Sequence, residues 1–458
     1  MLKKNEEYIV NIIDNGFQGE GVARIDGVTV FINGAIKNEK VKIKILKVQK
    51  SFAYGKILEF LEKSKHRRNS DCATYAKCGG CNLRHVNYEE TLKIKKATVE
   101  NCLYKELKKE IKINETIGME EPFFYRNKLL YPVGINEKNQ SVIGIYSNRS
   151  HNIIETNKCN IQNETCQNIA NDIFKFVKEN DISIYNEKTL KGSLRHIVIR
   201  IGIKTNEILV ILVLNDNIFK KDKQLIESLT SKYSEIKSIV KNYNTKNTNV
   251  ILGNKNEIIF GSGYIYDVLG EYKFKISPLS FYQVNPIQTK ILYNTAIKYV
   301  EDSPPRNLSD IALDLYCGIG TIGIWASKYF NKVYGIEISE DAIKDAKENA
   351  KINNIDNIEF YAGDVEIILP KIIEKNNIRP NVVFVDPPRK GLDNKTIETL
   401  LNLEAEKIIY ISCNPATLAR DLNLLQNKYE IKEVQPVDMF PWTSHVECVA
   451  LLQLKKDI

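Results

Sequence analysis

The sequence predicts an α/β protein with a C-terminal doubly wound, Rossmann-like sheet, an N-terminal small β-barrel and a central α+β domain. Three observations lead to this fold class. From about residue 286, apolar runs of five to seven residues alternate with helical stretches. Before residue 61, short apolar runs are separated by glycine turns, and the segment between them mixes strand-like and helix-like patterns. We therefore expect three domains, at residues 1–61, 62–285 and 286–458.

Composition narrows the class of protein. The chain has 458 residues, of which 43% are hydrophobic and 27% charged, as in soluble globular proteins. It contains no run of about 18 apolar residues and no N-terminal apolar segment with a small-residue cleavage site. We therefore expect a cytoplasmic protein, with a monomer as the favoured state. Its nine cysteines are then thiols or metal ligands, not disulfides.

The first domain is read from closely spaced strands. Its apolar runs are separated by D-N-G, D-G and N-G turns, which is typical of a small β-barrel. Residues 1–70 carry 14 Lys and Arg against 8 Asp and Glu, so 6 of the net +8 charges lie there. This excess favours a polyanionic partner, although a solvated surface explains it equally well. The segment resembles the TRAM domain, an RNA-binding barrel.

The central domain opens on a cysteine-rich segment. Cys72, Cys78 and Cys81 have the spacing C-x5-C-x2-C, and Cys159 lies far downstream. Three clustered cysteines plus a distant fourth are typical of ferredoxin-like iron–sulfur ligation. Structural zinc is the rival, because four-cysteine zinc sites are common, although only one C-x2-C pair is present. Cys166 is an alternative fourth ligand. A helix is expected at residues 88–110, and strands and helices follow to residue 285.

The C-terminal sheet places a glycine turn after its first strand. The strand IALDLYC ends in Gly318-Ile319-Gly320, where the backbone can turn tightly and approach a ligand. The segment satisfies G-x-G-x-x-G, so a nicotinamide-dependent dehydrogenase is the first rival. Glu337 ends the next strand, at a spacing suited to ribose hydroxyls.

The next two strand ends distinguish a dehydrogenase from a methyltransferase. Asp364 follows the third strand, where its carboxylate is placed to accept a hydrogen bond from an adenine amino group. The fourth strand ends in Asp386-Pro387-Pro388-Arg389. A Pro-Pro turn has no use in a dehydrogenase, whereas it walls the pocket between methyl donor and substrate in many methyltransferases. Ordinary βα turns are the structural alternative, but four such turns at successive strand ends favour a ligand site.

Two reactive side chains follow. Cys413 lies just past the fifth strand, where a thiolate is a competent nucleophile beside the ligand crevice. Glu447 precedes an apolar strand near the same edge and is a candidate base. The structural alternatives are a small buried thiol for Cys413 and a surface charge for Glu447.

Five motifs stand out in the chain: D-L-Y-C-G-I-G at 314–320, D-P-P-R-K-G at 386–391, S-C-N-P at 412–415, H-V-E-C-V at 445–449 and S-F-Y-Q-V-N at 280–285. Together they resemble the motifs of the RNA (uracil-5-)-methyltransferases. The chain looks most similar to the iron–sulfur-containing 23S ribosomal RNA enzymes with an N-terminal TRAM domain. The resemblance implies S-adenosylmethionine and a 4Fe-4S cluster as cofactors and RNA as partner.

The same resemblance assigns roles to residues. It implies that Cys413 is the nucleophile and Glu447 the base, and that Cys159 is the fourth cluster ligand. It also implies that the methyl-donor site is lined by Gln283, Tyr316, Glu337 and Asp386. Thiolate addition at uracil C6 makes C5 nucleophilic, and a base then removes the C5 proton. The target base must leave its stack to reach Cys413.

Other functions stay open at this point. Transfer RNA uracil methylation is an enzymatic alternative, and the added barrel and cysteine cluster favour ribosomal RNA by resemblance alone. A non-catalytic RNA-binding protein with a relict methyltransferase fold is a second alternative, against which the intact Cys413 and Glu447 argue. A cytosine-5 methyltransferase fits less well, because those RNA enzymes usually carry a Pro-Cys nucleophile motif.

Overall fold

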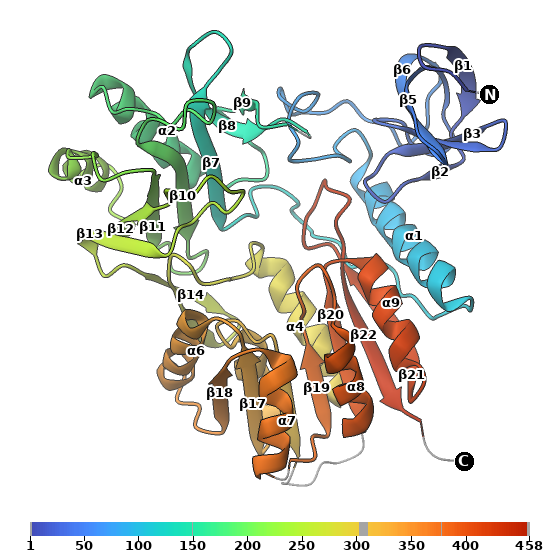
Figure 1. Cartoon of the computed structure of the whole chain (residues 1–458), viewed down its shortest axis with the longest axis vertical. Helices are drawn as coiled ribbons and strands as arrows, with labels where there is room; N and C mark the ends of the chain where they lie inside the picture. The colour runs from blue at the N-terminus through green and yellow to red at the C-terminus, as the bar shows by residue number, and fades with distance from the viewer. Residues whose placement is uncertain (1, 149, 302–309, 377, 456–458) are drawn as a thin grey trace.

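The computed structural model describes residues 2–148, 150–301, 310–376 and 378–455. Its three larger sheets lie in separate parts of the molecule, with the N-terminal sheet and the central sheet side by side above the C-terminal one (Figure 1). Within these ranges, no helix combines the length and the apolar composition that crossing a membrane requires.

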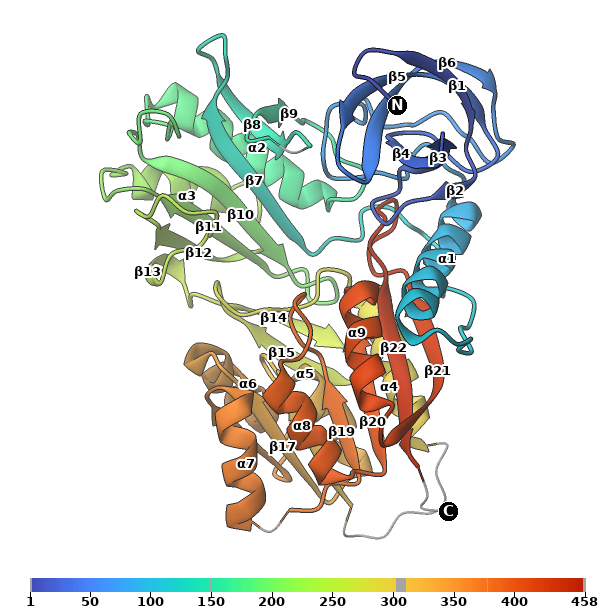
Figure 2. The same ribbon diagram turned by 45° about the vertical axis from the view of Figure 1, so that its right-hand side comes forward.

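The N-terminal part is a six-stranded, closely curled sheet with the order β1-β5-β6-β4-β3-β2 (Figure 2). Side chains alternate along β5, so that Val41, Ile43 and Ile45 are buried while the intervening lysines face outward. The period of two explains why this lysine-rich segment is a strand and not a solvated loop. The strands are β1 (Glu7–Asn11), β2 (Asp14–Asn15), β3 (Gly21–Ile25), β4 (Val28–Ile32), β5 (Lys40–Val48) and β6 (Phe52–Glu62).

The central part is a seven-stranded sheet with the order β13-β12-β11-β10-β7-β8-β9. Its middle strands β10 and β11 are buried along their whole length, and α2 and α3 pack on one face. The strands are β7 (Lys128–Ile135), β8 (Ser141–Tyr146), β9 (Ile153–Glu155), β10 (Leu194–Ile201), β11 (Ile208–Leu214), β12 (Ile236–Tyr243) and β13 (Lys255–Gly261); the helices are α2 (Glu164–Glu179) and α3 (Asp222–Thr230).

The C-terminal sheet has seven strands in the order β18-β17-β16-β19-β20-β22-β21. The first five are parallel, as the repeating apolar runs predict, and β22 runs antiparallel between β20 and β21. This last insertion departs from the dinucleotide-binding order, in which the sixth strand continues the sheet. The strands are β16 (Ile311–Leu315), β17 (Lys332–Glu337), β18 (Ile358–Ala362), β19 (Val382–Val385), β20 (Lys407–Ser412), β21 (Tyr429–Val437) and β22 (Glu447–Leu454).

Helices cover both faces of this sheet (Figure 2). They are α4 (Pro286–Glu301), α5 (Thr321–Ala326), the short 3-10 helix η1 (Ser327–Tyr329), α6 (Glu340–Ile352), α7 (Val365–Asn376), α8 (Asn394–Leu403) and α9 (Pro415–Leu425). The predicted fold class, a Rossmann-like α/β sheet behind a small β-barrel, is confirmed.

Two segments before residue 285 belong to the core of the C-terminal sheet. Helix α1 (Tyr88–Leu107) packs on it through Val99, Leu103 and Leu107, which recur every four residues on one helix face. The hairpin of β14 (Ile265–Leu269) and β15 (Tyr272–Ile276) joins the core on the other face. Residues on both sides of the expected boundary at 285 therefore pack in the same hydrophobic cores. The local sequence indicates a helix or a hairpin, but it does not indicate which distant surface that element packs against.

Candidate active site

The carboxyl ends of the parallel strands meet at one edge of the C-terminal sheet, where ligands of open α/β sheets bind. Five candidate residues lie at or just after these strand ends: Tyr316, Glu337, Asp364, Asp386 and Cys413. The structure therefore places at one edge five candidate residues that the sequence spreads over almost a hundred positions.

The turn after β16 is built for close approach. Tyr316, Gly318 and Gly320 have φ of 66°, 54° and 81°, all in the left-handed region that favours glycine. A Cβ at Gly320 would lie 2.7 Å from the Phe360 ring, so the packing excludes a side chain there. The Gly318 N–H donates to Glu337 Oε2 at 3.3 Å, which joins the first two strand ends.

Two buried carboxyl groups near this turn have raised pKa values. Burial raises the pKa of Asp314 to about 8, although the Gly323 N–H donates to its Oδ2 at 2.7 Å. Loss of hydration raises the pKa of Asp386 to about 7. Within the described part of the chain, Asp314 Oδ1 has no hydrogen-bond partner. Because buried carboxylates are costly, this edge favours positively charged groups.

Cys413 and Glu447 come together through the pairing of β20 with β22. The register pairs Ser412 with Cys448, which are the neighbours in sequence of Cys413 and Glu447. Cys413 is half-buried, whereas Glu447 is 4% exposed. Burial, reinforced by the neighbouring Asp386, raises the pKa of Glu447 to about 8. Burial and the charge of Glu447 raise the pKa of Cys413 to about 11.

Arg389 is the cation that opposes both shifts, since its charge lowers the pKa of Cys413 and of Glu447. Its carbonyl accepts hydrogen bonds from Asn414 Nδ2 at 3.1 Å and Thr417 Oγ1 at 3.3 Å, which tie the Pro-Pro turn to α9. The sequence motifs alone assign no role to Arg389 or Asp314. Asp314 lies in the motif D-L-Y-C and Arg389 in D-P-P-R, but the charge of a residue does not show which other side chains lie near it in the fold.

Gln283 lies on the segment between β15 and α4 and is 7% exposed. Its carbonyl accepts a hydrogen bond from Asn127 Nδ2 at 2.9 Å, which fixes the segment against the start of β7. The assignment of Gln283 to the donor site rests on the family resemblance of its motif.

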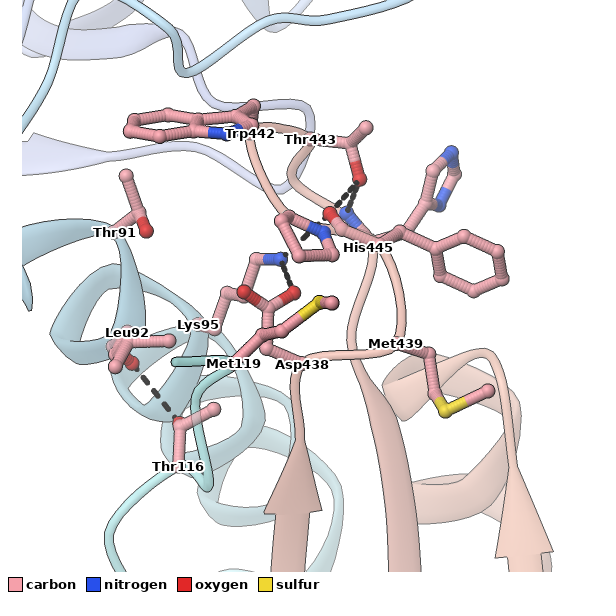
Figure 3. A network of polar contacts seen from close by, with 12 residues as sticks. Thr91, Leu92, Lys95, Thr116, Met119, Asp438, Met439, Trp442, Thr443 and His445 are labelled. Carbon is pink, nitrogen blue, oxygen red and sulfur yellow. Dashed lines mark hydrogen bonds and ion pairs between the residues drawn. The ribbon is translucent and has the colours of Figure 1, made fainter. Parts of the chain in front are cut away.

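The loop from Asp438 to Val446, which we call the β21–β22 loop, leads directly into Glu447. At its start, Lys95 of α1 forms an ion pair with Asp438, and both side chains are fully buried (Figure 3). Lys95 Nζ also donates to the Phe440 carbonyl at 3.1 Å, and Tyr88 OH donates to Asp438 Oδ2 at 2.8 Å. Gln288 Nε2 donates to the Asp438 carbonyl at 3.1 Å. Helices α1 and α4 thus hold the beginning of the loop.

The cysteines of the central segment line one small cavity. Cys72, Cys78, Cys81 and Cys159 all face it, together with Gly80. The Gly80 N–H donates to Cys78 Sγ at 3.2 Å. Cys166 lies apart, fully buried in the core between α2 and the central sheet. In the described part of the chain, no group of three or more His, Cys, Asp or Glu side chains is arranged to hold a metal ion.

The chain is similar to known protein families and to individual relatives. Residues 87–455 match the family described as tRNA (Uracil-5-)-methyltransferase, and residues 2–58 match the TRAM domain. An RNA methyltransferase of Clostridium acetobutylicum, named as uncharacterized, is 47% identical over 456 residues, which cover 99% of this chain and 98% of that protein. A Staphylococcus aureus protein of the same description is 42% identical over 455 residues, 99% of both chains.

Among solved structures, the chain is similar to the tRNA (uracil-54, C5)-methyltransferase of Pyrococcus abyssi, solved in complex with S-adenosyl-L-homocysteine. The TM-score is 0.76 at 25% sequence identity, and the match covers 98% of this chain and 100% of that one. The similarity therefore extends over the N-terminal, central and C-terminal sheets together.

Proposed function

Because this chain belongs to the tRNA (uracil-5-)-methyltransferase family, with a TRAM domain at its N-terminus, we propose that it methylates C5 of uridine in RNA with S-adenosylmethionine as methyl donor. The observation that carries the proposal is that Cys413 and Glu447 lie near each other at the strand-end edge, beside the paired Ser412 and Cys448, and that the charge of Glu447 acts on the thiol. A nucleophile and a base at one edge of a methyltransferase sheet are what C5 methylation of uracil requires.

The covalent step begins with loss of the Cys413 proton. Burial and the charge of Glu447 raise the thiol pKa to about 11, so the thiolate forms by losing its proton to water or a base in solution, and Glu447 is kept for the later step. The thiolate adds to uracil C6, and the electrons of the C5–C6 double bond move toward C5. Enolate-like C5 attacks the methyl carbon of the donor, and S-adenosylhomocysteine leaves with the electrons of the broken carbon–sulfur bond.

Ionised Glu447 then removes the C5 proton. The electrons of that C–H bond re-form the C5–C6 double bond, and Cys413 leaves as thiolate, so the protein is unchanged after each turnover. We assign the donor site to the turn after β16 and the neighbouring strand ends: Gln283, Tyr316, Gly318, Gly320, Glu337, Asp364 and Asp386. The acidic residues of this set suit a donor that carries a positive sulfonium.

RNA containing 5-fluorouridine tests the covalent step, because fluorine cannot leave C5 as a proton does. Wild-type protein with donor and this RNA should give an adduct that survives a denaturing gel, and Cys413→Ala should give none while still binding the donor. An active enzyme that forms no such adduct would rule out the mechanism.

For the substrate, we propose 23S ribosomal RNA, a choice that rests on the resemblance of the barrel and the cysteine segment to those of the ribosomal RNA enzymes. The similarity to a transfer RNA enzyme over 98% of the chain favours transfer RNA as the second candidate. Mass mapping of 5-methyluridine in both RNAs from a deletion strain decides between them. Loss from 23S RNA supports the first candidate, and loss from transfer RNA alone replaces it with the second.

We further propose that Cys72, Cys78, Cys81 and Cys159 hold a 4Fe-4S cluster. The residues fit this group in number and chemistry, since four thiols from two distant segments line one cavity. Arg84 lines it as well; burial raises the pKa of Cys81 to about 12, and the charge of Arg84 opposes this shift. Zinc is the alternative with the same ligand set. The cluster would cross-link the segment, and uracil methylation needs no electron from it.

A further inference from the structure

The carboxylate of Glu447 is buried, and the charged groups that act on it are Asp386 and Arg389. Among the described residues, none donates a hydrogen bond to its oxygens, although the side chain is buried. Glu447 is the first residue of β22 and directly follows the β21–β22 loop. The place of the carboxylate therefore depends on the conformation of that loop.

Trp442, in the middle of the loop, has a strained backbone. Its φ of 69° lies in the left-handed region, which is unfavourable for a residue with a bulky side chain. The side chain is 1% exposed, and its Nε1 donates to the Pro122 carbonyl at 2.7 Å. Such a conformation persists only where the surroundings impose it.

Those surroundings include the cysteine segment. Trp442 packs in one apolar cluster with Cys159 and Cys81, and the Arg84 guanidinium lies 5.0 Å from the centre of its ring. The Trp442 ring also lies 5.2 Å from the ring of Tyr88, the first residue of α1. Figure 3 shows the indole above Thr91 of the same helix. Trp442 is thus held between α1 and the cysteine segment.

Asn82, the residue after Cys81, makes the direct connection. The N–H groups of Asn82 and Leu83 donate to the Trp442 carbonyl at 3.2 and 3.0 Å. The Ser444 N–H donates to Asn82 Oδ1 at 2.7 Å, and Asn82 Nδ2 donates to Ser444 Oγ at 2.9 Å. Asn82 therefore binds the loop at Trp442 and again at Ser444, between Trp442 and Glu447.

We propose that Asn82 and Trp442 are positioning residues for the base: they transmit the order of the cysteine segment to Glu447 through the β21–β22 loop. The inference rests on the proposed function of Glu447 and assigns the cysteine site a part in C5 deprotonation. When the segment 78–83 loosens, the left-handed backbone at Trp442 relaxes, and Glu447, five residues later, shifts away from the C5 proton.

Asn82→Ala tests this connection, with Asn136→Ala as control. Asn136 makes similar side-chain bonds in the β7–β8 turn, remote from the loop, since its Oδ1 accepts from the N–H groups of Lys138 and Gln140 at 2.9 Å. We expect Asn82→Ala to slow turnover roughly 10- to 100-fold, because a shift of about 1 Å in a catalytic group costs that much. Methylated RNA bonded to Cys413 should accumulate, donor affinity should stay within about twofold, and Asn136→Ala should behave as wild type.

Asn82→Asp should recover most of the turnover, because it keeps the acceptor for the Ser444 N–H. Trp442→Phe, which keeps a ring but loses the bond to Pro122, should also accumulate adduct and serves if Asn82→Ala does not fold. RNA is used at saturation, since Asn82 Nδ2 also donates to the Gln18 carbonyl of the barrel at 2.6 Å.

The variant Glu447→Gln distinguishes a wrong positioning role for Asn82 and Trp442 from a wrong assignment of Glu447 as the base. If Glu447→Gln traps methylated RNA but Asn82→Ala and Trp442→Phe turn over without adduct, the positioning role is wrong and the proposed base stands. Slow turnover of both without adduct also overturns the positioning role, because then a step before deprotonation is impaired. If Glu447→Gln itself traps nothing, the proposed function of Glu447 fails.

Discussion

Lys95 and Asp438, 343 positions apart in the chain, form an ion pair in which neither side chain reaches solvent. The pair joins α1 to the point where β21 enters the β21–β22 loop (Figure 3). Burial lowers the pKa of Lys95, while Asp438 raises it. The lysine charge is stable there only because the carboxylate and the Phe440 carbonyl surround it.

Lys95→Met should destabilise the protein by about 3–5 kcal/mol, because it leaves the Asp438 carboxylate buried without its cation. Lys112→Met is the matched control, since it removes a largely exposed lysine that is paired with Glu433 of β21. That change should cost at most about 1 kcal/mol. Chemical denaturation measures the free energy of unfolding of both variants. Equal losses of this free energy would show that burial of the Lys95–Asp438 pair does not increase its contribution to stability.

Glu447→Gln should stop the reaction after methyl transfer. The variant keeps Cys413, so addition and transfer proceed, but no carboxylate removes the C5 proton. A denaturing gel should therefore show protein–RNA adduct carrying labelled methyl, whereas Cys413→Ala shows none. Full turnover by Glu447→Gln would assign the base to another residue.

The pH dependence of turnover should report Glu447. The base acts as carboxylate, and its pKa is raised to about 8, so the single-turnover rate should rise steeply with pH up to about 8. Above pH 8 the rise should become shallower but continue, because the thiol of Cys413, with a pKa raised to about 11, still loses its proton there. A rate that is already flat between pH 6 and 8, measured with stable protein, would contradict a base with a raised pKa.

The same shift has a consequence for stability. The folded-state pKa of about 8 exceeds the ordinary 4.5, so Glu447 stabilises the fold when protonated and loses this contribution as pH rises through 8. Glu447→Gln should therefore gain in melting temperature relative to wild type between pH 5 and 9. A constant difference over this range would show that the carboxyl is not buried as described.

Protein purified anaerobically should contain about four irons per chain. Cys159→Ser should lose them and Cys166→Ser should keep them, because Cys159 lines the shared cavity and Cys166 lies in another core. Zinc in stoichiometric amount without iron would select the zinc alternative, and the opposite pattern of the two variants would reassign the fourth ligand.

RNA affinity should depend on the exposed lysines at the end of β5. Changing Lys47 and Lys50 to Gln should weaken binding and lower the slope of affinity against salt by about one for each phosphate that is no longer neutralised. Lys220 and Lys223, equally exposed beside α3, are the control pair. Equal effects of the two pairs would mean that the barrel makes no special contact with RNA.

Much of the site can be predicted from the sequence because parallel strands carry a local signal. Each apolar run predicts a strand, and the residue after it falls at a common edge, so periodicity alone groups Glu337, Asp364, Asp386 and Cys413. The roles of Cys413 and Glu447 as nucleophile and base stay predictions, as do the cluster and the ribosomal substrate.

Other relationships have no local signal. Asp314 lies inside a strand where its neighbours explain its burial, and its raised pKa depends in part on Asp386 and Glu337 from other strands. The contacts of Asn82 with Ser444 and of Lys95 with Asp438 span more than 340 positions. Periodicity predicts which face of an element is covered, but only the folded chain shows what covers it.

The place of β22 between two antiparallel neighbours makes the length of the β21–β22 loop a determinant of chemistry. Successive residues of a strand face opposite sides, and here Val449 and Cys448 lie in different cores. Deleting one of the nine loop residues, 438–446, would offset the strand by one position, exchange its two faces and present a thiol where the carboxylate belongs. Insertions and deletions in this loop are therefore constrained as tightly as the identity of Glu447 itself.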